Sequence, residues 1–165
     1  MSTARTKQTQ DVVITHPNRD TAAAKTTRSL IVVLLAASAV LLFVITWGGW
    51  SHQAGGLALQ VVIGLLFVYF AYLVSNWRSG VLPIAAGLAV FSGIFAAVSI
   101  TGWFDRDGTG YQDPPLPSDL VAVLILAYAV LQLVVVVIAL RGFQQQWQVE
   151  LEVPRDEYNA GVGAY

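Results

Sequence analysis

A short acidic loop carries the side chains of this sequence that are best suited to chemistry. Its letters are DRDGTGYQD, from Asp105 to Asp113. Asp105, Asp107, Thr109 and Asp113 stand at positions one, three, five and nine of a twelve-residue calcium-binding loop, and Gly110 takes position six, where such loops turn sharply. The spacing therefore indicates a candidate metal site, with Asp105, Asp107 and Asp113 as its carboxylate ligands.

The residues after this loop do not complete the site. A loop of the EF-hand type ends in a bidentate glutamate at position twelve, which is followed by a helix. Here that position is Leu116, inside PPLP, where the helix should begin. A solvated turn with Gly108 and Gly110 explains the same letters. We expect no metal site; a weak calcium site, or a zinc site that includes His52, stays the alternative.

Four apolar blocks surround this loop and dominate the composition. Of the 165 residues, 56% are hydrophobic and 12% are charged, whereas soluble domains carry about a quarter charged residues. The blocks contain no Asp, Glu, Lys, Arg or His, and they cover residues 30–50, 57–75, 81–104 and 120–140. A helix needs about 20 apolar residues to cross a membrane. The sequence predicts an all-α integral membrane protein with four transmembrane helices, forming one bundle over residues 29–141.

The basic residues predict the orientation of this bundle. Only Arg106 lies in a loop on the side opposite to the termini; the other basic residues are Arg5, Lys7, Arg19, Lys25, Arg28, Arg78, Arg141 and Arg155. The positive-inside rule places that richer side in the cytoplasm. We expect residues 1–28 to be a disordered cytoplasmic tail and residues 142–165 to be a second cytoplasmic tail. A composition rich in Arg, Ala, Val and Gly is typical of a GC-rich bacterial genome and hence favours a bacterial plasma membrane.

The predicted spans lack the side chains that several membrane activities require. The chain has no cysteine, which excludes thiol and disulfide chemistry. His16 and His52 fall on opposite sides of the membrane, so they cannot ligate a haem within the bundle. No span holds a carboxylate for proton-coupled export or a Ser–His or Asp–Asp pair for proteolysis. We expect neither catalysis nor a cofactor.

Two features predict how the helices pack. Small residues recur every four positions in the third block, at Ala85, Ala89, Gly93 and Ala97. This small–xxx–small stripe favours close packing within the bundle, with self-association into a homo-oligomer as the alternative. Gln132 lies in the middle of the fourth block, where its amide should bond across a helix interface; such bonds contribute about 0.6 kcal/mol on average.

The C-terminal tail contains the strongest candidate for partner binding. Trp147, Val149, Leu151 and Val153 alternate with polar residues until Pro154, a period typical of a half-buried strand. This strand could add to the sheet edge of a membrane or cytoplasmic partner protein; a disordered tail is the equally weighted alternative. Pairing with the β-prone residues 12–15 would give only a two-stranded ribbon, which is marginal in water.

The sequence therefore predicts a non-enzymatic accessory or scaffold subunit, in contact with membrane lipids and a protein partner. The alternative is a small oligomeric transporter or channel without charges inside the membrane. The hexapeptide ARTKQT, Ala4–Thr9, resembles the start of a histone tail. The match does not continue, so we expect no nucleic-acid partner.

Overall fold

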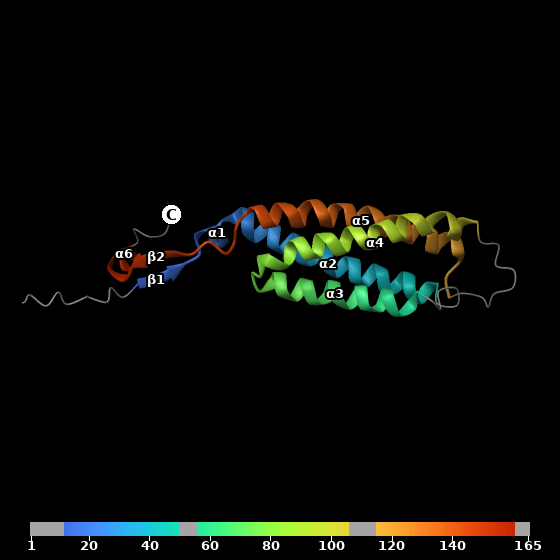
Figure 1. The fold of residues 1–165 in the computed structure, drawn as a ribbon, viewed down its shortest axis with the longest axis horizontal. Helices are drawn as coiled ribbons and strands as arrows, with labels where there is room; N and C mark the ends of the chain where they lie inside the picture. The colour runs from blue at the N-terminus through green and yellow to red at the C-terminus, as the bar shows by residue number, and fades with distance from the viewer. Residues whose placement is uncertain (1–11, 50–55, 106–114, 161–165) are drawn as a thin grey trace, which may run out of the picture.

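The computed structural model describes residues 12–49, 56–105 and 115–160. Most of these residues are helical, and two short strands pair near the chain ends (Figure 1). The elements in chain order are β1 Val12–Thr15, α1 Pro17–Asp20, α2 Ala22–Gly48, α3 Leu57–Ser75, the 3-10 helix η2 Ser79–Val81, α4 Leu82–Phe104, α5 Ser118–Gln144, β2 Leu151–Pro154 and α6 Arg155–Asn159.

Four of these helices (α2, α3, α4 and α5) are long and apolar enough to cross a membrane, as the sequence predicts. They are apolar on their outer faces as well as inside. Val98, Leu133 and Val33 are 74%, 69% and 63% exposed, and a soluble protein rarely shows a large contiguous apolar surface. These features are typical of a multi-pass membrane protein.

The four helices lie lengthwise beside one another and form an elongated bundle (Figure 1). We call the end where α2 begins and α5 ends the tail end, and the opposite one the loop end. Helix α3 packs on α2, α2 on α5, and α5 closely on α4, whereas α3 and α4 share few direct contacts. These two helices are joined through η2 at the tail end and diverge toward the loop end.

The first long helix begins earlier than its apolar block, at Ala22 instead of residue 30. Thr21 caps it, because its Oγ1 accepts a hydrogen bond from Ala24 N at 3.2 Å, and capping satisfies a backbone donor that the helix leaves free. Residues 12–28 thus contain β1, α1 and the start of α2, where the sequence predicts a tail that is disordered apart from its β-prone residues 12–15. Residues 1–11 lie outside the described part of the chain.

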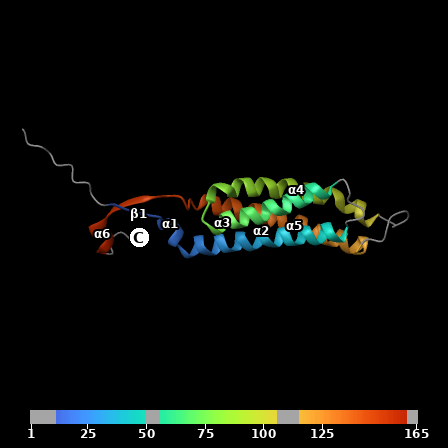
Figure 2. The same cartoon turned by 90° about the horizontal axis from the view of Figure 1, so that it is seen from below.

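The two strands form an antiparallel ribbon that projects from the tail end (Figure 2). Val12 is opposite Pro154, Val13 opposite Val153, Ile14 opposite Glu152, and Thr15 opposite Leu151. The pairing of β1 with β2 places residues 12–15 beside residues 151–154. We call β1, α1, β2 and α6 together the tail module.

Helix α4 presents a face of small residues to the interior of the bundle. Ala85 and Ala89 are 0% exposed, and the buried face continues through Ser92 and Ala96. Gly93 is half-buried, while Ala97 is exposed. The prediction was wrong for Ala97 because an α-helix has 3.6 residues per turn, so a spacing of four rotates by about 40° at each step.

Candidate functional site

Gln132 lies at the centre of the bundle, between α2 and α4. It is 1% exposed, and its Nε2 donates to Ser38 Oγ at 3.1 Å. Ser38 in turn donates to the carbonyl of Leu34 at 2.9 Å. Gln132 Oε1 is buried and has no hydrogen-bond partner among the described residues. The amide therefore links two helices but is only half satisfied.

Replacing Gln132 with leucine should change the free energy of unfolding in detergent by no more than about 1–2 kcal/mol. The change removes the bond to Ser38, but it also removes a buried acceptor that has no partner, and these effects oppose each other. Ser38 keeps its bond to Leu34. Denaturant unfolding of the purified protein measures the difference; a loss well above this range would contradict the account of the half-satisfied amide.

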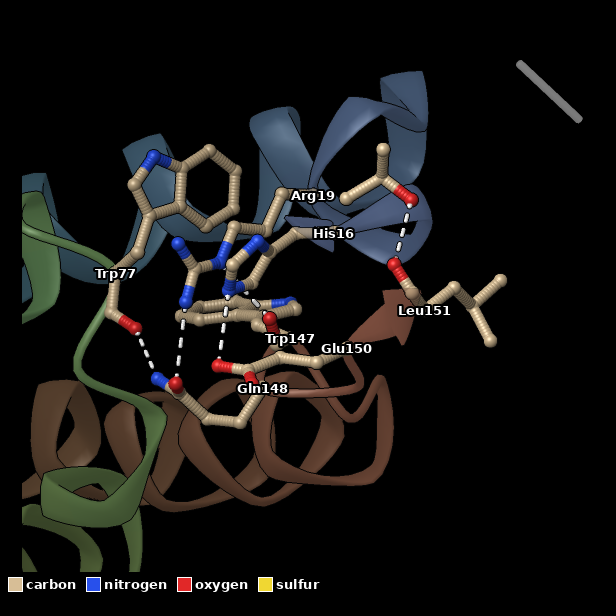
Figure 3. A network of polar contacts seen from close by, with 8 residues as sticks. His16, Arg19, Trp77, Trp147, Gln148, Glu150 and Leu151 are labelled. Atoms are coloured by element: carbon tan, nitrogen blue, oxygen red, sulfur yellow. Dashed lines mark hydrogen bonds and ion pairs between the residues drawn. The ribbon is translucent and has the colours of Figure 1, made fainter. Parts of the chain in front are cut away.

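The tail end carries the densest group of polar contacts in the described residues, arranged around Trp147 (Figure 3). The Trp147 side chain is 0% exposed. Its ring meets that of Trp77 edge to face, with centroids 5.5 Å apart, and its Nε1 donates to Gln145 Oε1 at 2.9 Å. Arg28 lies over the ring of Trp77, with its guanidinium carbon 4.3 Å from the ring centroid.

Residues from both ends of the chain hold this tryptophan in place. Arg19 Nε donates to the Trp147 carbonyl at 2.9 Å, and its Nη2 donates to Gln148 Oε1 at 3.1 Å. Gln148 Nε2 donates to the Trp77 carbonyl at 2.6 Å. Gln148 therefore links Arg19 to the backbone of Trp77, as Figure 3 shows. Asn18 Nδ2 also donates to the carbonyl of Gln146 at 3.1 Å. We call Asn18, Arg19, Arg28, Trp77, Trp147 and Gln148 the clasp.

Two residues at the clasp have a left-handed backbone. The φ angles of Trp77 and Gln146 are 61° and 50°, a region that bulky residues rarely adopt. Trp77 follows the end of α3, and the amides of Trp77 and Arg78 bond to the carbonyls of Val74 and Leu73 at 2.9 and 3.1 Å. This is the bond pattern of a Schellman motif, in which glycine is usual. The packing of both tryptophans offsets the cost of this conformation.

The predicted partner-binding segment, residues 147–153, is not one continuous strand in the structure. Its first residues form a turn, and only its last residues belong to β2. Trp147 belongs to the clasp, and Val149 N bonds to the Gln146 carbonyl at 3.2 Å in a turn. The strand begins only at Leu151. Val149 and Leu151 are 37% and 47% exposed, but Val153 is 9% exposed. The prediction of a continuous strand from Trp147 is wrong because a turn can carry the same alternation of apolar residues.

The acidic loop contributes one residue to the described structure. Asp105 ends α4, and its backbone N–H bonds to the Thr101 carbonyl at 3.0 Å. Asp107, Asp113 and His52 lie outside the described residues. Within the described ranges no three acidic, histidine or cysteine side chains come together as metal ligands. The absence of a metal site at Asp105–Asp113 stays a prediction.

Comparison with known proteins finds no matching family model, no similar curated protein and no similar solved structure. The function must therefore be argued from the bundle and the clasp themselves.

Proposed function

We propose that this protein is a non-enzymatic accessory subunit of a bacterial plasma membrane, which binds a partner protein through its tail module. In this proposal the four long helices span the bilayer and both termini lie in the cytoplasm. The described basic residues all belong to the tail end or the tail module; they are Arg19, Lys25, Arg28, Arg78, Arg141 and Arg155. The positive-inside rule favours a cytoplasmic position for such an end.

Close apolar packing in the tail-end half supports an accessory role over a transporter or channel. Ile31, Leu35, Leu82, Val135 and Ala139 meet there and are at most 1% exposed. A transport path needs polar groups along the whole depth of the membrane. Among the described residues of this half the buried polar side chains are Thr27 and Ser79, both close to the tail end. The apolar layer lies between them and Gln132, which favours a dry bundle.

The observation that carries the proposal is the ordered ribbon, which stands clear of the bundle and exposes apolar side chains. Val12 and Ile14 are 42% and 56% exposed. They share one face with Pro154 and Glu152, because directly opposed residues of an antiparallel pair point the same way. A ribbon of two short strands is marginal in water. An extended segment of a partner, added as a third strand at an edge of the ribbon with its side chains packed beside Val12 and Ile14, would stabilise it.

Replacing Ile14 with lysine should abolish recovery of the partner. The new ammonium group lies opposite Glu152, so the ribbon keeps a favourable cross-strand pair while the face loses its most exposed apolar side chain. Gln144→Lys is the matched control, because it adds the same charge to an exposed position at the end of α5. The measurement is quantitative co-purification from native membranes in mild detergent, with thermal unfolding to confirm equal folding.

The comparison between the two variants decides the outcome. A protein recovered in fixed ratio with the natural chain and with Gln144→Lys, but lost with Ile14→Lys, supports the proposal. Equal recovery with both variants would exclude the ribbon face as the binding surface. Recovery of only a second copy of this chain would replace the accessory role with homo-oligomerisation.

A further inference from the structure

A cavity of about 340 Å³ lies between α3 and α4 in the loop-end half of the bundle. It occupies the region where these two helices diverge (Figure 1). Leu59 and Ile63 of α3 form one wall, and Phe95 and Ala96 of α4 form the other. Residues of α2 and α5 close the base, among them Tyr128. The volume of the cavity lies within the range of sites for small organic ligands.

The buried hydroxyl of Tyr128 in this cavity lacks a hydrogen-bond partner among the described residues. Tyr128 is 2% exposed, and its hydroxyl lies beside Ser92 without meeting the geometry of a hydrogen bond to any described residue. Three other polar residues of the lining make hydrogen bonds within the protein. Ser92 and Ser99 donate to backbone carbonyls of α4 at 3.3 and 2.9 Å, and Gln60 Oε1 accepts from Thr46 Oγ1 at 2.8 Å. Burial of an unpaired hydroxyl is costly, so Tyr128 is a donor available to a bound molecule.

The remaining lining fixes the chemistry of that molecule. No acidic, basic or imidazole side chain is among the described residues that line the cavity, so a charged ligand would find no counter-ion there. Most of the lining is aliphatic or aromatic. The ligand must therefore be neutral and largely apolar, with a hydrogen-bond acceptor that reaches Tyr128.

Such an acceptor could be the ester group of a lipid or the carbonyl of an apolar molecule dissolved in the membrane. The depth of Tyr128 distinguishes the two. Tyr128 stands ten residues after Ser118, the first residue of α5, and therefore about 15 Å along the helix from its loop end. In a bilayer with a hydrocarbon layer about 30 Å thick, this position is below the level of lipid ester groups. A carbonyl carried on a freely dissolved apolar molecule can reach it.

We propose that this cavity binds a quinone-like molecule of the membrane, whose carbonyl oxygen accepts a hydrogen bond from the Tyr128 hydroxyl. The molecule enters between α3 and α4 from the bilayer. The binding involves no electron transfer by the protein. It is independent of the partner-binding role of the tail module, and either proposal can fail without the other.

The experiment measures saturable binding of a decyl-substituted benzoquinone to the full-length protein in phosphatidylcholine nanodiscs. Quinones quench indole fluorescence, and Trp103 lines the cavity, so quenching reports occupancy. Tyr128→Phe should weaken binding at least fivefold without lowering the unfolding temperature, because the hydroxyl makes no hydrogen bond within the described part of the chain. Ala96→Phe should abolish binding by filling the cavity, and the smaller Ala96→Leu should weaken it. Ala97→Phe, at the exposed neighbouring position, should leave it unchanged.

Competition with two further probes tests the ligand class. Decane, which has no acceptor, and a fatty-acid methyl ester, which mimics a lipid ester, should each compete at least tenfold more weakly than the quinone. Equal competition by decane would overturn the role of the Tyr128 hydroxyl, and equal competition by the ester would assign the cavity to lipid. Unchanged binding in both Ala96 variants would overturn the site itself, and so would a lower unfolding temperature in Tyr128→Phe without weaker binding.

Discussion

Replacing Trp147 with alanine should lower the free energy of unfolding by about 3–5 kcal/mol, the cost of truncating a fully buried aromatic side chain. The substitution removes the edge-to-face contact with Trp77 and the bond from Nε1 to Gln145. It also leaves Trp77 in a left-handed conformation without the ring that packs on it. Reversible unfolding of the purified protein, followed by circular dichroism, measures the change.

Trp47 offers a matched control for this experiment. It is 59% exposed on α2, so Trp47→Ala should change the free energy of unfolding by no more than about 0.5 kcal/mol, as surface substitutions usually do. Trp147→Ala should also make β1 sensitive to proteolysis, because the turn that the ring anchors carries the carbonyls that bind Asn18 and Arg19 of α1, directly after that strand. Similar losses in the two tryptophan variants would contradict the account of the clasp.

Replacing Gly93 with leucine should destabilise the bundle by about 1–3 kcal/mol, the usual cost of overpacking. A Cβ atom at Gly93 would lie 3.2 Å from Gln132 Cβ. That atom is attached directly to the α5 backbone and cannot rotate away, so α4 and α5 would have to separate. The same unfolding experiment measures this loss, and it should be accompanied by weaker packing around Ser38.

Gly87→Leu controls for the removal of a helical glycine. A Cβ atom at Gly87 would have no neighbour within 4 Å, so this substitution should be neutral, or stabilising by about 0.5–1 kcal/mol, through better helix propensity. Phe91→Leu, at a position 43% exposed, should also have little effect. Equal losses at Gly93 and Gly87 would remove the case for a close α4–α5 contact.

The long helices were predictable because the hydrocarbon layer imposes a simple rule of length and polarity. The second apolar block illustrates this, since its predicted range is 57–75 and α3 covers the same residues. The extension of α2 back to Ala22 was missed because its first turns contain Lys25, Thr26, Thr27 and Arg28. Lys and Arg are nonetheless good helix formers, and the cap at Thr21 satisfies a backbone donor of the added turns.

The clasp could not be predicted, because its contacts join residues far apart in the chain. Asn18 and Arg19 bond to residues 127–129 positions later in the chain. No local sequence pattern predicts pairs that are so far apart. The buried position of Tyr128, in contrast, could have been recognised from the sequence. It stands four residues before Gln132 and hence on the same face of α5, so a polar group in the core at one position indicated the second.

The most direct test of the central claim, that the two tails form one ordered ribbon on one side of the membrane, is cysteine cross-linking. The natural chain has no cysteine, so a Val13→Cys/Val153→Cys double variant contains only the pair under test. These residues are directly opposed, at a separation that a disulfide can bridge. Val12→Cys/Val153→Cys places its thiols on opposite faces and serves as the control.

Mild oxidation of the protein in intact membranes, followed by thiol alkylation and mass spectrometry, measures the intramolecular disulfide. The ribbon predicts rapid and nearly complete cross-linking of residues 13 and 153, and slow or incomplete cross-linking of residues 12 and 153. Equal yields from the two pairs would contradict the register. No cross-link from either pair would contradict the ribbon and, with it, the surface proposed to bind the partner.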